Sequence, residues 1–112
     1  MSRLRLTPSA RDDLREIKTY IARELQNPSA AINTVASITK ALRLLIDFPA
    51  MGAPLSSIVD IETDYRFLVS GNYTAFYRCD DDTVYVIRIL YGRRDFMKIL
   101  FHDTSEDDAW EE

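Results

Sequence analysis

The sequence has very few of the residues that build disulfides and metal centres. It holds one cysteine, Cys79, and one histidine, His102. A single thiol excludes an internal disulfide, and two such side chains are too few for a structural zinc site, which takes four Cys or His ligands. We therefore expect no metal, no cofactor and no disulfide, as suits a protein of the reducing cytoplasm. Cys79 lies in a β-rich segment, where we expect a small core residue.

Glycine and long apolar runs are also scarce. The three glycines form no phosphate-binding loop. No run approaches the roughly 20 apolar residues of a membrane span, and residues 1–11 are too polar for a signal peptide. With 112 residues, of which 46% are hydrophobic and 29% charged, the chain is expected to form one globular cytoplasmic domain that does not contact a membrane.

The charges are unevenly distributed along the chain. The net charge is −4, yet residues 1–101 carry 14 basic and 12 acidic side chains, a net charge of +2. Residues 102–112 hold six acids and neither lysine nor arginine. The body is too weakly basic to indicate a nucleic-acid-binding protein. We expect a folded domain over residues 1–101 and a disordered acidic tail over residues 102–112, because the tail has little apolar surface to bury.

The C-terminal half has the pattern of a small antiparallel sheet. Residues 65–69, 73–79 and 84–91 are rich in aromatic and β-branched side chains, which favour strands. The first two runs are joined by Ser70, Gly71 and Asn72, a hairpin signal, and the next two by three aspartates, which mark a solvated turn. The pattern predicts a three-stranded meander, followed by a short helix over residues 95–101.

The N-terminal half has the pattern of a strand and two helices. Residues 3–6 alternate polar and apolar side chains, as a short strand does. Thr7 and Asn27 each precede a proline, which is the signature of a capped helix start. The helices are expected to end near residues 25 and 47 and to form an antiparallel helical hairpin on the sheet. The expected apolar stripes are Ala10, Leu14, Ile17, Ile21 and Leu25 in the first helix, and Ala31, Val35, Ile38, Leu42, Leu45 and Ile46 in the second.

These elements predict an α+β fold with an irregular loop between its halves. Residues 48–54 contain two prolines and one glycine, which disfavour regular structure.

The three predicted strands each contain one arginine, namely Arg66, Arg78 and Arg88. These arginines either extend separately from a sheet face or form one basic patch, and we favour the first interpretation because single strand arginines are common.

The order of elements and several short motifs together resemble the RelE/ParE superfamily of bacterial type II toxins. The resemblance covers residues 5–100. Its carriers are Ala10-x-x-Asp13-Leu14-x-x-Ile17-x-x-Tyr20-Ile21, Phe48-Pro49-x-Met51-Gly52-x-Pro54, Tyr65-Arg66-x-Leu68, Tyr73-x-x-Phe76-Tyr77-Arg78, and Ile89-Leu90-Tyr91-Gly92-Arg93-Arg94-Asp95-Phe96-Met97.

The resemblance implies one of two activities. RelE-like members cut messenger RNA on the ribosome with basic residues and a tyrosine on the sheet face, whereas ParE-like members bind DNA gyrase. At the matching nuclease positions this chain keeps Arg66 and Arg94, but it has Leu68 and Thr74 where basic residues are expected. The expected tyrosine is also missing, and Tyr91 is the only local substitute, so these residues fit a nuclease poorly.

We therefore favour a ParE-like toxin of a plasmid stabilisation system, a gyrase inhibitor that arrests growth and is not itself an enzyme. The alternatives are a RelE-like messenger RNA endoribonuclease, acting through Arg66, Arg94 and Tyr91, and a non-toxic relative that only binds antitoxin. The resemblance implies a cognate antitoxin as partner, and a homodimer or a heterotetramer with antitoxin as the assembly. The predicted target-binding residues are Tyr91, Arg93, Arg94 and Met97, and the predicted antitoxin-binding residues, expected to be partly exposed, are Tyr20 and Leu55.

Overall fold

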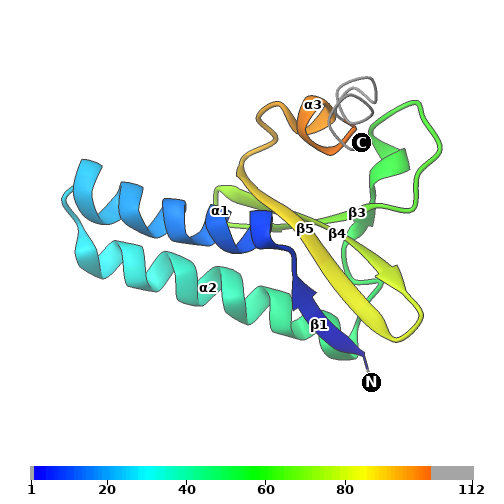
Figure 1. Cartoon of the computed structure of the whole chain (residues 1–112), viewed down its shortest axis with the longest axis horizontal. Coiled ribbons are helices and arrows are strands. Elements are labelled where there is room, and N and C mark those ends of the chain that lie inside the picture. Colours follow the sequence, from blue (N-terminus) through cyan, green and yellow to red (C-terminus); the bar gives the residue numbers. More distant parts are fainter. Residues whose placement is uncertain (1, 102–112) are drawn as a thin grey trace, which may run out of the picture.

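The computed structural model describes residues 2–101 and shows an α+β fold, as predicted (Figure 1). The acidic segment 102–112, which we predicted to be disordered, lies outside the described residues. Within residues 2–101 no helix has the length and apolar character needed to cross a membrane. The elements are β1 (Arg3–Leu6), α1 (Pro8–Thr19), a π-helical turn (Tyr20–Glu24), α2 (Pro28–Asp47), β2 (Ala53–Pro54), a 3₁₀ turn (Leu55–Ser57), β3 (Arg66–Ser70), β4 (Tyr73–Asp80), β5 (Thr83–Tyr91) and α3 (Phe96–Leu100).

The sheet is larger than the predicted meander and is mixed. Its five strands lie in the order β1-β5-β4-β3-β2. β3, β4 and β5 form the expected antiparallel meander, while β1 pairs in parallel with β5. The expectation of an irregular loop over residues 48–54 is wrong at its end, because Ala53 and Pro54 pair with β3 as an edge strand. A proline is tolerated there because an edge strand need not donate on both sides.

The two helices cover one face of the sheet as an antiparallel hairpin (Figure 1). Both predicted caps are present: the Thr7 hydroxyl accepts from the Ala10 N–H at 3.0 Å, and the Asn27 side chain accepts from the Ala30 N–H at 3.1 Å. The core between helices and sheet contains Ile38, Leu42 and Leu45 of the predicted α2 stripe, whereas Val35 and Ile46 are only half-buried. Its buried members are Ala10, Ile38, Leu42, Leu45, Ala75, Tyr77, Val84, Val86 and Ile89.

The other face of the sheet is covered by α3 and by the segment that follows β2. Phe67 and Phe76 lie on this face, and the Phe76 ring stacks on Phe96 of α3 with 5.5 Å between centroids. Phe96 is therefore partly buried against this face of the sheet. A second apolar cluster thus holds α3 at the end of the chain described here.

Two apolar residues lie differently from the prediction. α1 ends at Thr19, and the π-helical turn closes with a bond from the Leu25 N–H to the Tyr20 carbonyl. The wider turn breaks the helical spacing, so the stripe stops at Ile21 and Leu25 is 56% exposed. Cys79 is also exposed rather than buried, because it lies at the end of β4 beside the solvated turn.

Candidate functional site

The chain leaves β5 through an ordered turn. Gly92 has a φ of 57°, a conformation that glycine adopts without steric cost, and its N–H donates to the Asn72 carbonyl at 2.7 Å. The residues on both sides of Gly92 are exposed. Tyr91 is 60% exposed, Met97 is 41% exposed, and Arg93 and Arg94 are exposed. The four predicted target-binding residues, Tyr91, Arg93, Arg94 and Met97, are thus all exposed within one short stretch of chain, which we call the β5 exit.

The side chains of the β5 exit differ in how firmly they are held. The Arg93 guanidinium lies over the Phe67 ring, 5.5 Å from its centroid, in a cation–π contact that restricts its motion. Arg94 forms no ion pair within residues 2–101. The β5 exit therefore presents one guanidinium held over Phe67 and a second that has no ion pair within residues 2–101.

Three tyrosines connect the β5 exit with the helical hairpin. The rings of Tyr73 and Tyr91 meet edge-on with 5.6 Å between centroids. Partial burial, followed by the electrostatic influence of Tyr91 and Tyr20, raises the pKa of Tyr73 above its usual value. Tyr20 is 53% exposed, as the antitoxin prediction requires. Tyr20, Tyr73 and Tyr91 form what we call the tyrosine cluster.

A shallow depression lies beside the tyrosine cluster, between α2 and the sheet. Ala41, Leu68, Ser70 and Tyr73 line it, and its walls are almost wholly apolar. Among residues 2–101 no group of three or more acidic, histidine or cysteine side chains is arranged to hold a metal ion. The depression is lined in part by the buried core residues Ile38, Leu42, Ala75 and Ile89, so it is a shallow feature of the apolar surface rather than a cavity for a ligand.

The edge of β5 that leads to the exit is completed by side chains of α1. β1 ends at Leu6, and beyond it the Thr7 hydroxyl donates to the Ile87 carbonyl at 2.8 Å. Asp13 then accepts from the Ile89 N–H at 2.8 Å and from the Arg88 Nε and Nη2 at 2.7 and 2.9 Å. The bond to Asp13 raises the pKa of Arg88.

The sequence interpretation missed this pairing. Asp13 and Arg88 are 75 residues apart, and only the packing of α1 against β5 brings them together. The one local signal in the sequence is that the acidic residue Asp13 lies beside the apolar stripe of α1. In the structure, Asp13 is only 7% exposed. A carboxylate in that place needs a partner.

The residues of the alternative nuclease site are not brought together. Arg66 lies opposite Tyr77 on β4, whereas Tyr91 lies opposite Tyr73. Four residues along a strand separate these positions, a distance of about 13 Å. The Arg66 guanidinium donates to the Gly52 carbonyl at 2.7 and 3.1 Å, so it fastens a loop and does not point toward the β5 exit.

The strand arginines do not form one basic patch. Arg66 bonds to loop carbonyls, Arg88 bonds to Asp13, and Arg78 lies 3.4 Å from Asp64 in an exposed pair. The favoured interpretation, that these arginines act separately, fits this arrangement. Each of them has its own partner and stabilises a different contact of the fold.

The expectation that Leu55 is partly exposed for an antitoxin is wrong. Leu55 is fully buried, and its N–H donates to the Tyr65 carbonyl at 2.8 Å. The 3₁₀ turn after β2 directs its side chain into the second apolar cluster, beside Phe67, Phe76 and Leu90. Of the two predicted antitoxin residues, only Tyr20 is on the surface.

Comparison with known proteins identifies the family. The family model for the ParE toxin of the type II toxin-antitoxin system, parDE, matches residues 4–96. The chain is similar in fold to the chromosomal ParDE system from P. aeruginosa, with a TM-score of 0.70 and 24% identity over 82% of this chain and 97% of that chain. It is also similar to the toxin-antitoxin complex RelBE2 from Mycobacterium tuberculosis, with a TM-score of 0.59 and 23% identity over 80% of this chain and 96% of that chain. A search among curated proteins gave no match. Because the family model spans most of the folded body, the chain belongs to the ParE toxin family of type II toxin–antitoxin systems.

Proposed function

We propose that the chain inhibits DNA gyrase, arrests growth in the cytoplasm and is neutralised by a cognate antitoxin, as in plasmid stabilisation systems. The supporting observation is the β5 exit, where Tyr91, Arg93, Arg94 and Met97 are exposed on one ordered turn. Exposed aromatic and arginine side chains are the residue types that dominate protein–protein contacts. The chain would act by binding its target, without catalysing a reaction.

The alternative of a RelE-like messenger RNA nuclease has less support. General acid–base cleavage needs its groups within hydrogen-bond reach of one phosphate. Arg66 is fastened to loop carbonyls, and the two other matching positions contribute no charge, since Leu68 packs against the core and Thr74 is 2% exposed. Only Tyr91 and Arg94 remain near each other, and an ordinary tyrosine is a weak base at neutral pH.

The antitoxin is proposed to cover the tyrosine cluster and the adjoining depression. Tyr20 is half exposed on the hairpin, and the depression beside Tyr73 has apolar walls. An amphipathic segment that folds on binding covers such a surface with few residues. The RelBE2 structure is of a toxin-antitoxin complex, which supports binding of a cognate antitoxin here.

A gyrase cleavage assay tests the proposed target. The purified chain is added to gyrase, ATP and supercoiled plasmid, and the DNA is analysed after the protein is digested. We expect linear DNA to accumulate, and to disappear when antitoxin is added first. Primer extension on messenger RNA in a translating extract serves as the opposing test. Codon-phased cuts together with intact plasmid would support the nuclease alternative and contradict the proposal.

A non-toxic relative that only binds antitoxin would behave differently from both toxins. Induced expression would leave growth unchanged, and neither plasmid nor messenger RNA would be cut. Antitoxin would still bind, because Tyr20 and Tyr73 of the tyrosine cluster are not among the proposed target-binding residues. Growth arrest on induction therefore separates the proposal from this third possibility.

A further inference from the structure

Phe67 lies beneath Arg93 of the β5 exit, although the two residues are distant in the sequence. The Arg93 guanidinium is 5.5 Å from the centroid of the Phe67 ring. Phe67 belongs to β3, whereas Arg93 follows β5, so the contact joins the exit turn to a different part of the sheet. Arg94, the next residue, has no such contact within residues 2–101. The exit therefore carries one arginine with an aromatic support and one without.

The Phe67 ring is a rigid support. Phe67 pairs on both sides, with Phe76 of β4 and with Ala53 of β2, and only 8% of it is exposed. Its ring lies 6.4 Å, between centroids, from the ring of the fully buried Phe76, which in turn stacks on Phe96 of α3 at 5.5 Å. Close-packed side chains sit in well-defined rotamers. The three rings thus fix the surface on which the Arg93 guanidinium lies.

The backbone of the exit turn is also held on both sides of Arg93. The Gly92 N–H donates to the Asn72 carbonyl at 2.7 Å, and the Arg93 carbonyl accepts from the Phe96 N–H at 3.3 Å. An arginine normally loses much rotamer freedom when it binds a partner. Because its main chain is held and its guanidinium rests on a ring, Arg93 has lost part of that freedom before binding. Such ordering in advance favours association.

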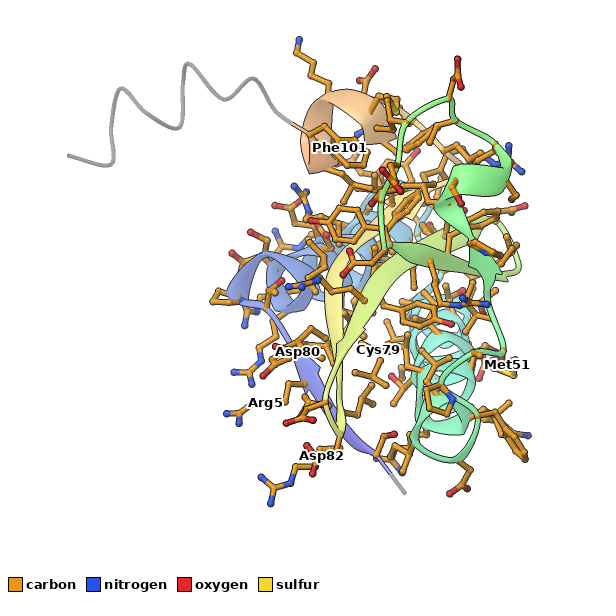
Figure 2. The ribbon with its side chains drawn as sticks, turned by 90° about the vertical axis from the view of Figure 1, so that its right-hand side faces the viewer. Arg5, Met51, Cys79, Asp80, Asp82 and Phe101 are labelled. Atoms are coloured by element: carbon orange, nitrogen blue, oxygen red, sulfur yellow. The ribbon has the colours of Figure 1, made fainter. Side chains whose placement is uncertain are left out.

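The charge of Arg93 has no acidic partner in the described part of the chain. Neither Arg93 nor Arg94 forms an ion pair within residues 2–101. The aspartates at positions 80–82 lie at the start of β5, whereas the exit is at its end. Figure 2 shows this separation, with Asp82 at one end of the molecule and Phe101, directly after α3, at the other. A guanidinium over a ring still presents N–H donors, which suit a carboxylate or phosphate of a partner.

We infer that Phe67 is a positioning residue, which holds Arg93 in the orientation in which the guanidinium binds the target. Phe67 is nearly buried and acts through Arg93. The inference rests on the proposed function, since it assigns a role within the β5 exit. Phe67→Leu removes the ring face and keeps an apolar side chain. It should raise the concentration of chain that gives half-maximal linear DNA about two- to fivefold, the factor that corresponds to one cation–π contact at an exposed site.

Nuclear magnetic resonance of the full chain tests the positioning without any target. Ring currents shift protons above an aromatic face upfield, so the Nε–H resonance of Arg93 should lie upfield of that of Arg94. Its order parameter should also be the higher of the two. In Phe67→Leu both differences should disappear. The first comparison uses the unmodified chain, so it decides the question even if Phe67→Leu does not fold. Equal shifts and order parameters for the two arginines would overturn the inference.

A cycle of substitutions tests whether Phe67 acts through Arg93. Phe67→Leu should weaken the toxin in the parent and in Arg94→Ala, but should have no further effect in Arg93→Ala. The matched control is Phe76→Leu, which removes a fully buried ring of the same apolar cluster and leaves the ring under Arg93 in place. It should lower the melting temperature at least as much as Phe67→Leu without moving the Arg93 resonance. A loss from Phe67→Leu that is as large in Arg93→Ala as in the parent contradicts positioning.

The behaviour of the parent chain separates this inference from the proposed function. If the parent arrests growth but forms no linear DNA, gyrase is not the target, and the same cycle is measured as growth arrest at graded induction. If the parent neither arrests growth nor forms linear DNA, the proposed function fails and the inference fails with it. If the parent forms linear DNA and Phe67→Leu is equally potent, only the inference is overturned.

Discussion

At the scale of single residues, the Asp13 side chain accepts a hydrogen bond from β5 that the short strand β1 does not reach. β1 pairs with β5 only as far as Val86, and a bulge follows, since Phe76 lies opposite Arg88 and Tyr77 opposite Val86. Without a partner the Ile89 N–H would be buried and unsatisfied, which costs about 1–3 kcal/mol. The carboxylate satisfies it and holds Arg88 as well. One side chain therefore joins α1 to the strand that leads to the β5 exit.

We expect Asp13→Ala to destabilise the fold by about 3 kcal/mol, the lower end of the range for breaking a buried pair, because Arg88 is 29% exposed and regains some water. Asp13→Asn should cost less, since one amide oxygen still accepts. The control is Asp12→Ala, which removes an exposed carboxylate paired with Arg15 and should cost at most about 1 kcal/mol. Urea denaturation measures all three. Equal losses for Asp12→Ala and Asp13→Ala would show that the pair is not structural.

A glycine is needed at position 52 because a side chain there would clash with its neighbours, not because the backbone has a positive φ. A Cβ at this position would lie 2.5 Å from the Phe67 carbonyl oxygen and 2.7 Å from the Tyr77 hydroxyl. We expect Gly52→Ala to cost about 3 kcal/mol, as overpacking of a buried contact does. Gly71→Ala is the comparison: its φ is 61°, but nothing lies within 4 Å of the added Cβ, so the strain should cost only about 1 kcal/mol. Thermal melting that ranks Gly71→Ala as the more damaging variant would contradict this steric explanation.

At the scale of elements, local chemistry predicted what short stretches of chain determine. The caps at Thr7 and Asn27 and the turn at Gly71 are fixed by neighbouring residues, so the helices and the meander were predicted with nearly their true bounds. The pairings of β1 and β2 were not predicted, because each depends on a strand far away in the sequence. Leu25 was misplaced because a π-helical turn has no distinct apolar pattern.

The candidate sites also divide into those made by neighbouring residues, which the sequence predicts, and those made by distant segments, which it does not. The residues of the β5 exit lie in one continuous segment, so their exposure could be predicted from the sequence. Leu55 was expected to be partly exposed because the architecture of the resembled family leaves apolar groups for an antitoxin, whereas its short turn packs into the second apolar cluster with residues of α3. The bonds of Arg66 and Arg88 join distant segments, and no pattern along the chain indicates them.

Truncation of Tyr20 on the hairpin surface and of Leu55 in the buried turn should therefore affect different properties, antitoxin affinity and stability respectively. We expect Tyr20→Ala to reduce antitoxin affinity at least about tenfold with little change in stability, because Tyr20 is half exposed. Leu55→Ala should cost about 2–5 kcal/mol of stability, as for other fully buried leucines, and should not alter antitoxin affinity of the folded protein. Calorimetric titration with antitoxin and urea denaturation measure the two effects. The control for affinity is Ile58→Ala, which truncates a 38% exposed residue near Leu55. Unchanged affinity in Tyr20→Ala would remove the hairpin from the antitoxin interface.

At the scale of the whole molecule, the helical hairpin and α3 lie on opposite faces of the sheet (Figure 1). The tyrosine cluster lies where the hairpin meets the sheet, and the β5 exit leads across to α3. Tyr91 belongs to both groups, since its ring contacts Tyr73 while its chain enters the exit turn. Under the proposed function, an antitoxin that covers the tyrosine cluster would also restrict access to Tyr91, the first residue of the exit.

This arrangement predicts that Arg93 and Arg94 serve toxicity and not the fold. The Arg93 contact with Phe67 is exposed and worth about 0.5–1 kcal/mol, and Arg94 has no ion pair within residues 2–101. Arg93→Ala/Arg94→Ala should therefore abolish growth arrest on induction while melting and antitoxin pull-down stay close to those of the parent. The matched control is Arg3→Ala/Arg5→Ala, which removes two exposed arginines from β1.

The control separates the position of the arginines from their charge. Both double variants lower the net charge by the same amount, so a general electrostatic attraction to gyrase-bound DNA would weaken both alike. A specific contact at the β5 exit requires that only Arg93→Ala/Arg94→Ala loses toxicity. If that variant still arrests growth like the parent, the exit is not the target surface. If it loses toxicity together with a large fall in melting temperature, the arginines support the fold. Because Gly92 turns the chain outward before both of them, we expect neither of these results.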